Sequence, residues 1–436
     1  MTMKNVSLAA LSILVLNAPA VGQITAAQEG VAATLSLTQA VHKAVDWHPS
    51  IDVAVGELHQ GEAEIRVARA GYRPKLSAGV APGIEIYNGA RWQPQAQVSA
   101  SQMLYDFGKV SNAVASAQAA MRVNRAQLLA AIDDLVRDTA YAVIEVQRYK
   151  ALLVVAQDQL AAIQDITGLV KQRTSKGAST RSDAVQADAR VEDARTTILQ
   201  ISSELGRWRN TLAHMVGSRD LPDVTPDVPD WYNRLCVRMT PDWDEMPQVL
   251  QYAARKDQAR ADLQEARAQG MPTVAFQVTG DSYLRTPLRG RSDFTVGVNI
   301  SSNIFDGGAT RGRREAASYA LRAADAALDN ARNDAGRALD EARSQIASLT
   351  EALGVLSSRE GNMEETSKLY KLQYFSLGTR TLLDLLNSEQ ELHQAKFDYV
   401  NHAHDIRRLN QDCLYSGGRT RDSFALTGMT IRGITL

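Results

Sequence analysis

Few side chains of this sequence have the types and spacing that chemistry at a site requires. His402 and His404 are two residues apart, and on a helix that spacing points two side chains to different faces, so we expect no metal site there. The sequence contains no phosphate-binding glycine loop, nucleophile elbow or zinc-binding helix motif. We therefore expect no metal, no cofactor and no catalytic residue, and the protein is not expected to be an enzyme.

Cys236 and Cys413 are the only cysteines of the chain. In an exported protein, an even pair of cysteines can form a disulfide. Two separate buried thiols are the alternative, and the sequence leaves both open. The formal net charge of −1 gives no reason to expect a nucleic-acid partner.

The first residues have the pattern of a secretory signal. Lys4 supplies a positive charge, residues 6–16 form an apolar stretch, and Ala18–Ala20 resembles a cleavage site. We expect a signal peptide over 1–20, with cleavage as late as 27 as the alternative. No later stretch is apolar over the roughly 18 residues that a spanning helix needs, so an exported chain would cross a membrane only with strands.

The remaining sequence is an internal duplication, with two similar copies of one unit. Leu104–Gly108 returns as Ile304–Gly308, and Gly177–Asp183 aligns with Gly378–Asp384 at an offset of 201 residues. A repeat of this kind indicates an array of two similar structural units. Because the spacing is nearly constant, the elements of the two copies should have the same lengths.

Long helices are expected in both copies. Residues 95–221 and 288–436 contain no proline, the residue that most strongly interrupts a helix. As one helix, the segment Gly108–Gly177 would be about 100 Å long. A turn and a returning helix follow each time, so 107–217 and 306–416 are predicted to be helical pairs of coiled-coil type.

Just before each long helix the hydrophobic period changes to two. In 74–106 and 272–305 apolar residues alternate with small or polar ones, as Phe294 and Val296 do with Thr295. Two strands per copy, each with one apolar face and one polar face, fit a sheet with lipid on one side and water on the other. A soluble sandwich or edge hairpin also shows alternation and is the alternative.

Four strands cannot close a membrane barrel, because such barrels have at least about eight strands and an open edge in lipid leaves backbone groups without partners. The chain must therefore share its sheet with copies of itself. Two copies would nearly fill the lumen with side chains, whereas three would leave room for a pore. The polar residues Gln95, Gln97 and Asn299 on the inner face favour three.

These features together resemble the TolC-type outer-membrane channel family, from about Leu35 to Tyr415. The most specific match is Gly378–Leu386 followed by Ala395. The resemblance implies an internally duplicated, mainly α fold with a transmembrane β part. Four strands from each chain of a homotrimer would form a twelve-stranded β-barrel that continues into a long α-helical barrel. It also implies a location in the outer membrane with extension into the periplasm.

The resemblance also assigns the connecting segments. Residues 35–73 and 218–271 would form helices and an equatorial belt around the helical barrel, to which the C-terminal end contributes. This arrangement could bring Cys236 and Cys413 together. The final residues, 417–436, are predicted to form a flexible tail.

By the same resemblance, the turn after each long helix lies at the periplasmic tip, where the channel narrows. Asp384 would form a ring of three carboxylates at this pore constriction, and Asn387 stands where the family often has a second acid. Like charges in a narrow pore raise carboxylate pKa values and favour cations. A single acidic ring therefore predicts weaker cation selectivity than two rings.

The resemblance further implies a gating latch. Arg380 would pair with Asp183 of the other hairpin, close to Ser182, and hold the tip closed. Phe375 occupies a position where the family's best-known pattern has a tyrosine, so that hydrogen bond is expected to be missing. The alternative is a solvated surface pair worth under about 1 kcal/mol.

The family meets its periplasmic adaptor at the same tip. The resemblance therefore implies docking roles for Lys176, Gly177, Leu377 and Gly378. The same four residues are needed to form the turns, and both roles can hold.

The implied function is a passive exit duct in contact with outer-membrane lipid. An inner-membrane ABC or proton-driven transporter would supply the energy through the adaptor. The sequence leaves open whether the duct serves type I protein secretion or multidrug efflux. The alternative from another class is a non-conducting trimeric coiled-coil stalk or surface protein.

Overall fold

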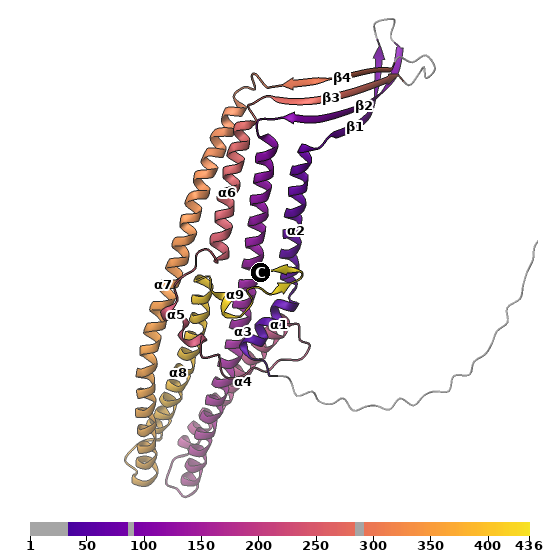
Figure 1. Ribbon diagram of the computed structural model, residues 1–436. Coiled ribbons are helices and arrows are strands. Elements are labelled where there is room, and N and C mark those ends of the chain that lie inside the picture. Colours follow the sequence, from indigo (N-terminus) through magenta and orange to yellow (C-terminus); the bar gives the residue numbers. More distant parts are fainter. Residues whose placement is uncertain (1–33, 86–90, 284–291) are drawn as a thin grey trace, which may run out of the picture.

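The computed structural model describes residues 34–85, 91–283 and 292–436. The expected signal peptide lies outside these residues. The molecule is elongated, with a four-stranded sheet at one end and two helical hairpin tips at the opposite end (Figure 1).

The predicted duplication and the predicted long helices are confirmed, since α3 has 67 residues and α7 has 64. The first copy contains α1 (Leu37–Trp47), α2 (Pro49–Arg69), η1 (Ala70–Tyr72), β1 (Lys75–Glu85), β2 (Arg91–Tyr105), α3 (Lys109–Ser175) and α4 (Arg181–Val216). The second copy contains α6 (Pro247–Ala268), β3 (Thr273–Tyr283), β4 (Ser292–Ser301), α7 (Ala309–Leu372), η3 (Gln373–Leu377) and α8 (Leu382–Ser416). Between the copies lie η2 (Tyr232–Arg234) and α5 (Leu235–Arg238).

Each long helix begins where the sequence places an aspartate before a glycine. Oδ2 of Asp106 accepts a hydrogen bond from the backbone N–H of Val110 at 2.6 Å, and Oδ2 of Asp306 accepts one from Thr310 at 2.8 Å. These carboxylates satisfy amide groups that have no partner within the first helical turn. Without proline to interrupt it, each helix then extends for about 100 Å.

The four strands form one antiparallel sheet in the order β1-β2-β3-β4. The register places Phe276 opposite Val298 on one face, which is apolar and exposed in the single chain. On the other face Ser77 lies opposite Ser99, with their hydroxyl oxygens 2.7 Å apart. A sheet face made of exposed apolar side chains indicates a non-aqueous neighbour.

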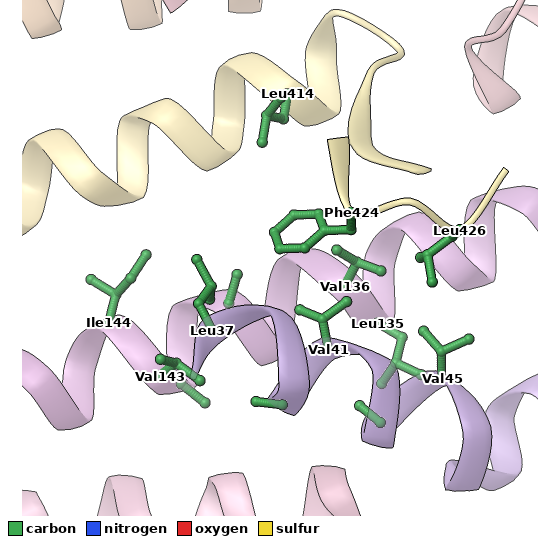
Figure 2. Close-up of a cluster of buried hydrophobic side chains, with 14 of the residues drawn as sticks. Leu37, Val41, Val45, Leu135, Val136, Val143, Ile144, Leu414, Phe424 and Leu426 are labelled. Atoms are coloured by element: carbon green, nitrogen blue, oxygen red, sulfur yellow. The ribbon is translucent and has the colours of Figure 1, made fainter. Parts of the chain in front are cut away.

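The largest core lies part-way along the helices, where α1 packs against α3. Figure 2 shows Val41 of α1, Val136 of α3 and Leu414 of α8 gathered near Phe424. All four side chains are buried. This core holds the N-terminal helix, the first long helix and the end of the chain together.

The prediction of a flexible tail for 417–436 is wrong. These residues, here called the C-terminal strap, contain α9 (Thr420–Ser423), β5 (Thr430–Ile431) and β6 (Ile434–Thr435). Phe424 and Leu426 of the strap are buried in the core. The tail is ordered because its apolar residues enter a core built by distant parts of the chain, which a local pattern does not reveal.

A buried ion pair also holds the C-terminal strap. Nη1 of Arg421 lies 2.8 Å from Oδ2 of Asp133 on α3, and both side chains are almost fully buried. A second guanidinium nitrogen of Arg421 donates to the backbone carbonyl of Glu245 at 2.5 Å. At the surface, Arg432 donates from Nε to Asp52 of α2 at 2.7 Å.

The segment between the copies is tied to α7 and α8. A disulfide joins Cys236 of α5 to Cys413 of α8, with the Cα atoms 5.5 Å apart. Arg343 of α7 donates from Nε to the backbone carbonyl of Cys236 at 3.2 Å and from Nη2 to that of Met239. The segment is thus attached to both helices of the second hairpin.

Reduction of this disulfide is expected to lower the thermal midpoint of the protein in detergent. The two cysteines are separated by 177 residues, and closing a loop of that length stabilises a chain by about 5 kcal/mol in the chain-entropy description. Cys413→Ala should lower the midpoint similarly and remove its response to reductant. A wild-type midpoint that ignores reductant, together with two titratable free thiols, would contradict this prediction.

Candidate functional site

The two hairpin tips lie side by side at the end of the molecule opposite the sheet (Figure 1). The chain reverses through Gly177 with φ 73° at one tip and through Gly378 with φ 69° at the other. Side chains strain a backbone in this left-handed conformation. Both glycines therefore have the turn role that was expected of them.

Asp183 and Asp384 occupy equivalent positions in the capping boxes of α4 and α8. The carboxylate of Asp384 accepts from the backbone N–H of Thr381 at 3.3 Å. That of Asp183 accepts from the hydroxyl of Ser179 at 2.6 Å and from the backbone N–H of Thr180 at 3.1 Å. Each side chain thus has a structural role at a helix start, whatever else it does.

These hydrogen bonds also set the charge of the two carboxyls. The hydroxyl of Ser179 is the main cause that lowers the pKa of Asp183, and the Thr381 side chain is the main cause at Asp384. Both groups are therefore ionised at neutral pH. In the single chain the pKa shift of Asp384 is opposite to the one that a ring of like charges would cause.

The expected pair of Arg380 with Asp183 does not form within the chain. The guanidinium of Arg380 lies over the ring of Tyr370, 4.5 Å from its centroid, and Nε donates to Gln373 at 3.2 Å. Both contacts are within its own hairpin. Ser182 is exposed beside Asp183. Arg380 is directed toward its own helix because an aromatic ring and an amide acceptor lie close to it there.

A different arginine joins the two hairpins. Nη1 of Arg173, near the end of α3, donates to the backbone carbonyls of Tyr374 at 2.9 Å and Phe375 at 3.1 Å. Nη2 donates to the carbonyl of Ala178 at 3.2 Å. The guanidinium also lies over the Tyr374 ring, 5.0 Å from its centroid. This set of contacts, the Arg173 clamp, uses the planar fork of an arginine in a way that a lysine cannot.

A tyrosine hydroxyl is present at the tip, one residue before the expected position. The hydroxyl of Tyr374 lies 3.3 Å from Oγ of Ser179 in the other hairpin. Phe375 packs edge-on against the Tyr374 ring, with 4.7 Å between centroids. The polar contacts between the hairpins at the tip are thus made by Tyr374 and by the Arg173 clamp, beside a buried apolar cluster that includes Val170 of the first hairpin and Leu385 of the second.

Sequence reasoning missed both Arg173 and Tyr374. The signal that could have found them is the repeat, because the offset of 201 residues makes these two positions equivalent. Residues at equivalent positions of adjacent hairpins are candidates for contact. The clamp itself depends on η3, a π-helical turn that ends α7 but has no counterpart at the end of α3. Such turns are rare and frequently occur at functional sites.

A groove of about 540 Å³ lies between the ends of α3 and α7. It is called the basic groove here because four of its side chains are cationic and none is acidic. Its lining residues are Leu169, Gln172, Arg173, Lys176, Lys368, Lys371, Leu372, Phe375 and Ser376. Of the residues expected at the docking tip, Lys176 lines this groove, and Leu377 is exposed beside it.

Asp384 and Asn387 lie about one turn apart on α8, so they share a face of the helix. Asp384 is half-exposed and Asn387 is exposed. Within the described ranges, no group of three or more His, Cys, Asp and Glu side chains could hold a metal ion. The helices of the same ranges include none that is long and apolar enough to cross a membrane.

An amphipathic sheet at one end and paired helical hairpins at the other define an outer-membrane channel that extends into the periplasm. The chain belongs to the outer membrane efflux protein family, whose model matches residues 26–218 and 244–411. This match confirms the resemblance that was drawn from the sequence. The protein is an exit channel of the outer membrane, and its family is made up of channel proteins.

Curated relatives are similar over most of the chain. Outer membrane efflux protein BepC of Brucella suis is 22% identical over 404 residues, which are 90% of this chain and 87% of the relative. Alkaline protease secretion protein AprF of Pseudomonas aeruginosa is 22% identical over 417 residues, covering 84% and 82%.

A solved structure supports the fold. The outer membrane protein VceC of Vibrio cholerae superposes with a TM-score of 0.76 at 20% identity, over 88% of this chain and 96% of that one. At this level of identity the similarity shows the architecture alone. It confirms the mainly α fold with a four-stranded sheet at one end.

Proposed function

We propose that three copies of this chain form a passive duct that is closed at the helical tips. The observation that carries the proposal is the sheet, in which β1 and β4 are edge strands of the described chain. In lipid each unpaired backbone group costs several kcal/mol. Pairing β4 of one copy with β1 of the next removes both edges. Three copies enclose a wider lumen than two, and the polar face with Ser77 and Ser99 would line it.

Two kinds of contact would keep the tips closed. The Arg173 clamp holds the two hairpins of one copy together. Between neighbouring copies, Arg380 would pair with Asp183, beside Ser182, since Asp183 uses only Oδ2 for its hydrogen bonds with Ser179 and Thr180. Opening would then require both contacts to break as the second hairpin moves outward.

The duct would work with other proteins. A periplasmic adaptor would dock at Lys176, Gly177, Leu377 and Gly378. An inner-membrane ABC or proton-driven transporter would supply the energy, because a passive duct has no energy source of its own. One relative is named for efflux and another for secretion of an alkaline protease, which supports both efflux and protein secretion as roles of the duct.

Single-channel recording of the purified full-length protein in a planar bilayer tests this proposal. We expect discrete, small conductance steps and a native mass of three chains in detergent. A folded trimer that stays silent in the bilayer would instead favour the non-conducting stalk. A folded single chain that never assembles would contradict the shared sheet.

Asp384→Asn is expected to weaken the cation preference of the channel at least about twofold, because it removes one charge per copy from the constriction. Asparagine keeps an oxygen that can accept from Thr381, so the start of α8 is preserved. The reversal potential in a salt gradient measures the change. Asp188→Asn is the matched control, since Asp188 pairs with Lys171 away from the tip turn.

The same ring predicts a pH dependence. The pKa of Asp384 is lowered from the ordinary 3.8, so its charge is present above that pH and is lost as the pH falls through the lowered pKa. Three carboxylates in one ring would oppose this shift by raising one another's pKa, so wild-type cation preference should be retained at pH 8 and lost as the pH falls through the pKa of the ring. An unchanged reversal potential in Asp384→Asn would show that Asp384 does not line the constriction.

A further inference from the structure

We propose that the basic groove binds an acidic amphipathic helix, and that a carboxylate of this partner draws Arg173 away from the second hairpin. The inference rests on the proposed function, because it states what chemistry the docking partner has and how docking opens the gate.

The charge of the basic groove is not neutralised by its surroundings. Lys368 has a partner, Glu364, at 2.8 Å. In contrast, Lys176 and Lys371 make no ion pair or side-chain hydrogen bond with any described residue. No acidic side chain lines the groove. Two uncompensated cations in a concave site attract a partner of opposite charge.

The basic groove also exposes apolar side chains. Leu169 and Leu372 lie on its two walls and are 37% and 55% exposed. Exposed leucines beside lysines fit a helix that carries apolar anchors on one face and acidic residues next to them. The groove lies between two helix ends, so a third helix can pack against both.

The helix dipoles explain only part of this surface. Cations near the C-terminal end of a helix are ordinary, because they interact favourably with the dipole, and this accounts for Arg173 and Lys371. Lys176 is the C-cap residue of α3 and is favoured in the same way, but the exposed leucines gain nothing from a dipole. The combination of free cations with exposed leucines is what points to a partner.

Arg173 links binding in the groove to the gate. Its Nε is buried and has no acceptor among the described residues, although its other nitrogens hold the carbonyls of Tyr374 and Phe375. A carboxylate of a partner that binds in the groove can accept hydrogen bonds from Nε and one Nη of Arg173 at the same time. A carboxylate carries a full negative charge and accepts two parallel N–H groups of the fork, so this bidentate pair would compete with the separate bonds of Arg173 to uncharged carbonyls. Arg173 would therefore leave the carbonyls of η3, and the contact between the two hairpins at the tip would be weakened, which favours opening.

The test uses two synthetic helical peptides that differ only in charge. Each has 20 residues with leucines alternately three and four positions apart, which keeps them on one helix face, and the acidic peptide has glutamate where the neutral one has glutamine. Binding to the detergent-solubilised full-length channel is measured by fluorescence anisotropy at low and high salt. We expect the acidic peptide to bind at least about tenfold more tightly at low salt, and this preference to shrink at high salt.

Two double variants locate the binding. Lys176→Gln with Lys371→Gln should abolish the preference for the acidic peptide. Lys171→Gln with Lys256→Gln should keep it, because those lysines pair with Asp188 and Asp325 outside the groove. Equal binding of the two peptides, or an unchanged preference in the first double variant, would overturn the proposal.

Recordings separate this proposal from the duct itself. The acidic peptide, added at the tip side, should raise the conductance of the wild type and have no further effect on Arg173→Gln. A conducting trimer that ignores the peptide would overturn the docking proposal and leave the duct intact. If the groove double variant falls apart into single chains, the groove is a contact between copies and the proposed partner is excluded.

Discussion

Arg173→Gln should raise the single-channel conductance while the trimer stays assembled. The variant removes the planar fork that holds the carbonyls of Tyr374 and Phe375 in the other hairpin. Two hydrogen bonds at about 0.5–1.5 kcal/mol each amount to roughly 1–3 kcal/mol per copy. A change of that size shifts an open–closed equilibrium by roughly 5- to 150-fold, so long-lived larger steps should appear.

Three further variants make this prediction specific. Arg173→Lys keeps the charge but can serve only one carbonyl well, so an intermediate conductance is expected. Arg195→Gln is the control, because among the described residues Arg195 forms its ion pair with Glu192 of its own helix, at 2.8 Å. Arg380→Ser tests the contact between copies separately. If Arg380→Ser opens the channel and Arg173→Gln does not, the clamp is structural and the gate lies between copies.

Arg421→Met should destabilise the protein by about 3–5 kcal/mol, because it leaves the buried carboxylate of Asp133 without its cation. Burial raises the pKa of Asp133 to about 7, and the nearby Arg421 opposes that rise. Without Arg421 the pKa rises further. Unfolding by guanidinium in detergent measures the loss, and protease sensitivity of the C-terminal strap should increase in parallel.

The loss of stability in Arg421→Met should depend on pH. A carboxyl whose pKa in the folded state is raised above its unfolded value favours folding when protonated, so its contribution is lost as the pH rises through the folded pKa. The deficit of Arg421→Met should therefore be smaller at pH 5 than at pH 8. A deficit that grows toward low pH would contradict the burial of a charged Asp133.

Two controls accompany this variant. Asp133→Leu with Arg421→Met removes both charges and should recover most of the stability, as replaced buried pairs commonly do. Arg432→Met removes an exposed pair with Asp52 in the same C-terminal strap and should cost under about 1 kcal/mol. If Arg421→Met and Arg432→Met have equal effects, the buried pair does not hold the strap.

Features with a local cause could be predicted from the sequence. Long runs without proline predicted the helices, and a hydrophobic period of two predicted the strands. The aspartates before glycine predicted the helix starts, which Asp106 and Asp306 confirm. These signals involve residues a few positions apart, so no knowledge of the tertiary structure was needed.

Features that join distant segments could not be predicted in this way. Arg421 and Asp133 are 288 residues apart, and nothing near Arg421 marks it as buried. The same is true at the tip, where the resemblance to the family predicted that Arg380 would join the hairpins. In the chain, Tyr370 lies close enough to hold Arg380, and Arg173 joins the hairpins instead. Which arginine crosses between hairpins depends on packing that appears only in the folded structure.

The two copies of the repeat differ at their tips, and this difference affects how many partner molecules one trimer would bind. At the offset of 201 residues, Lys176 corresponds to Leu377 and Lys371 corresponds to Val170, so the lysines of the basic groove are not repeated. A trimer would have six hairpin ends in a ring of approximate sixfold symmetry but only three basic grooves. A partner that recognises shape would find six similar positions, whereas one that recognises charge would saturate at three.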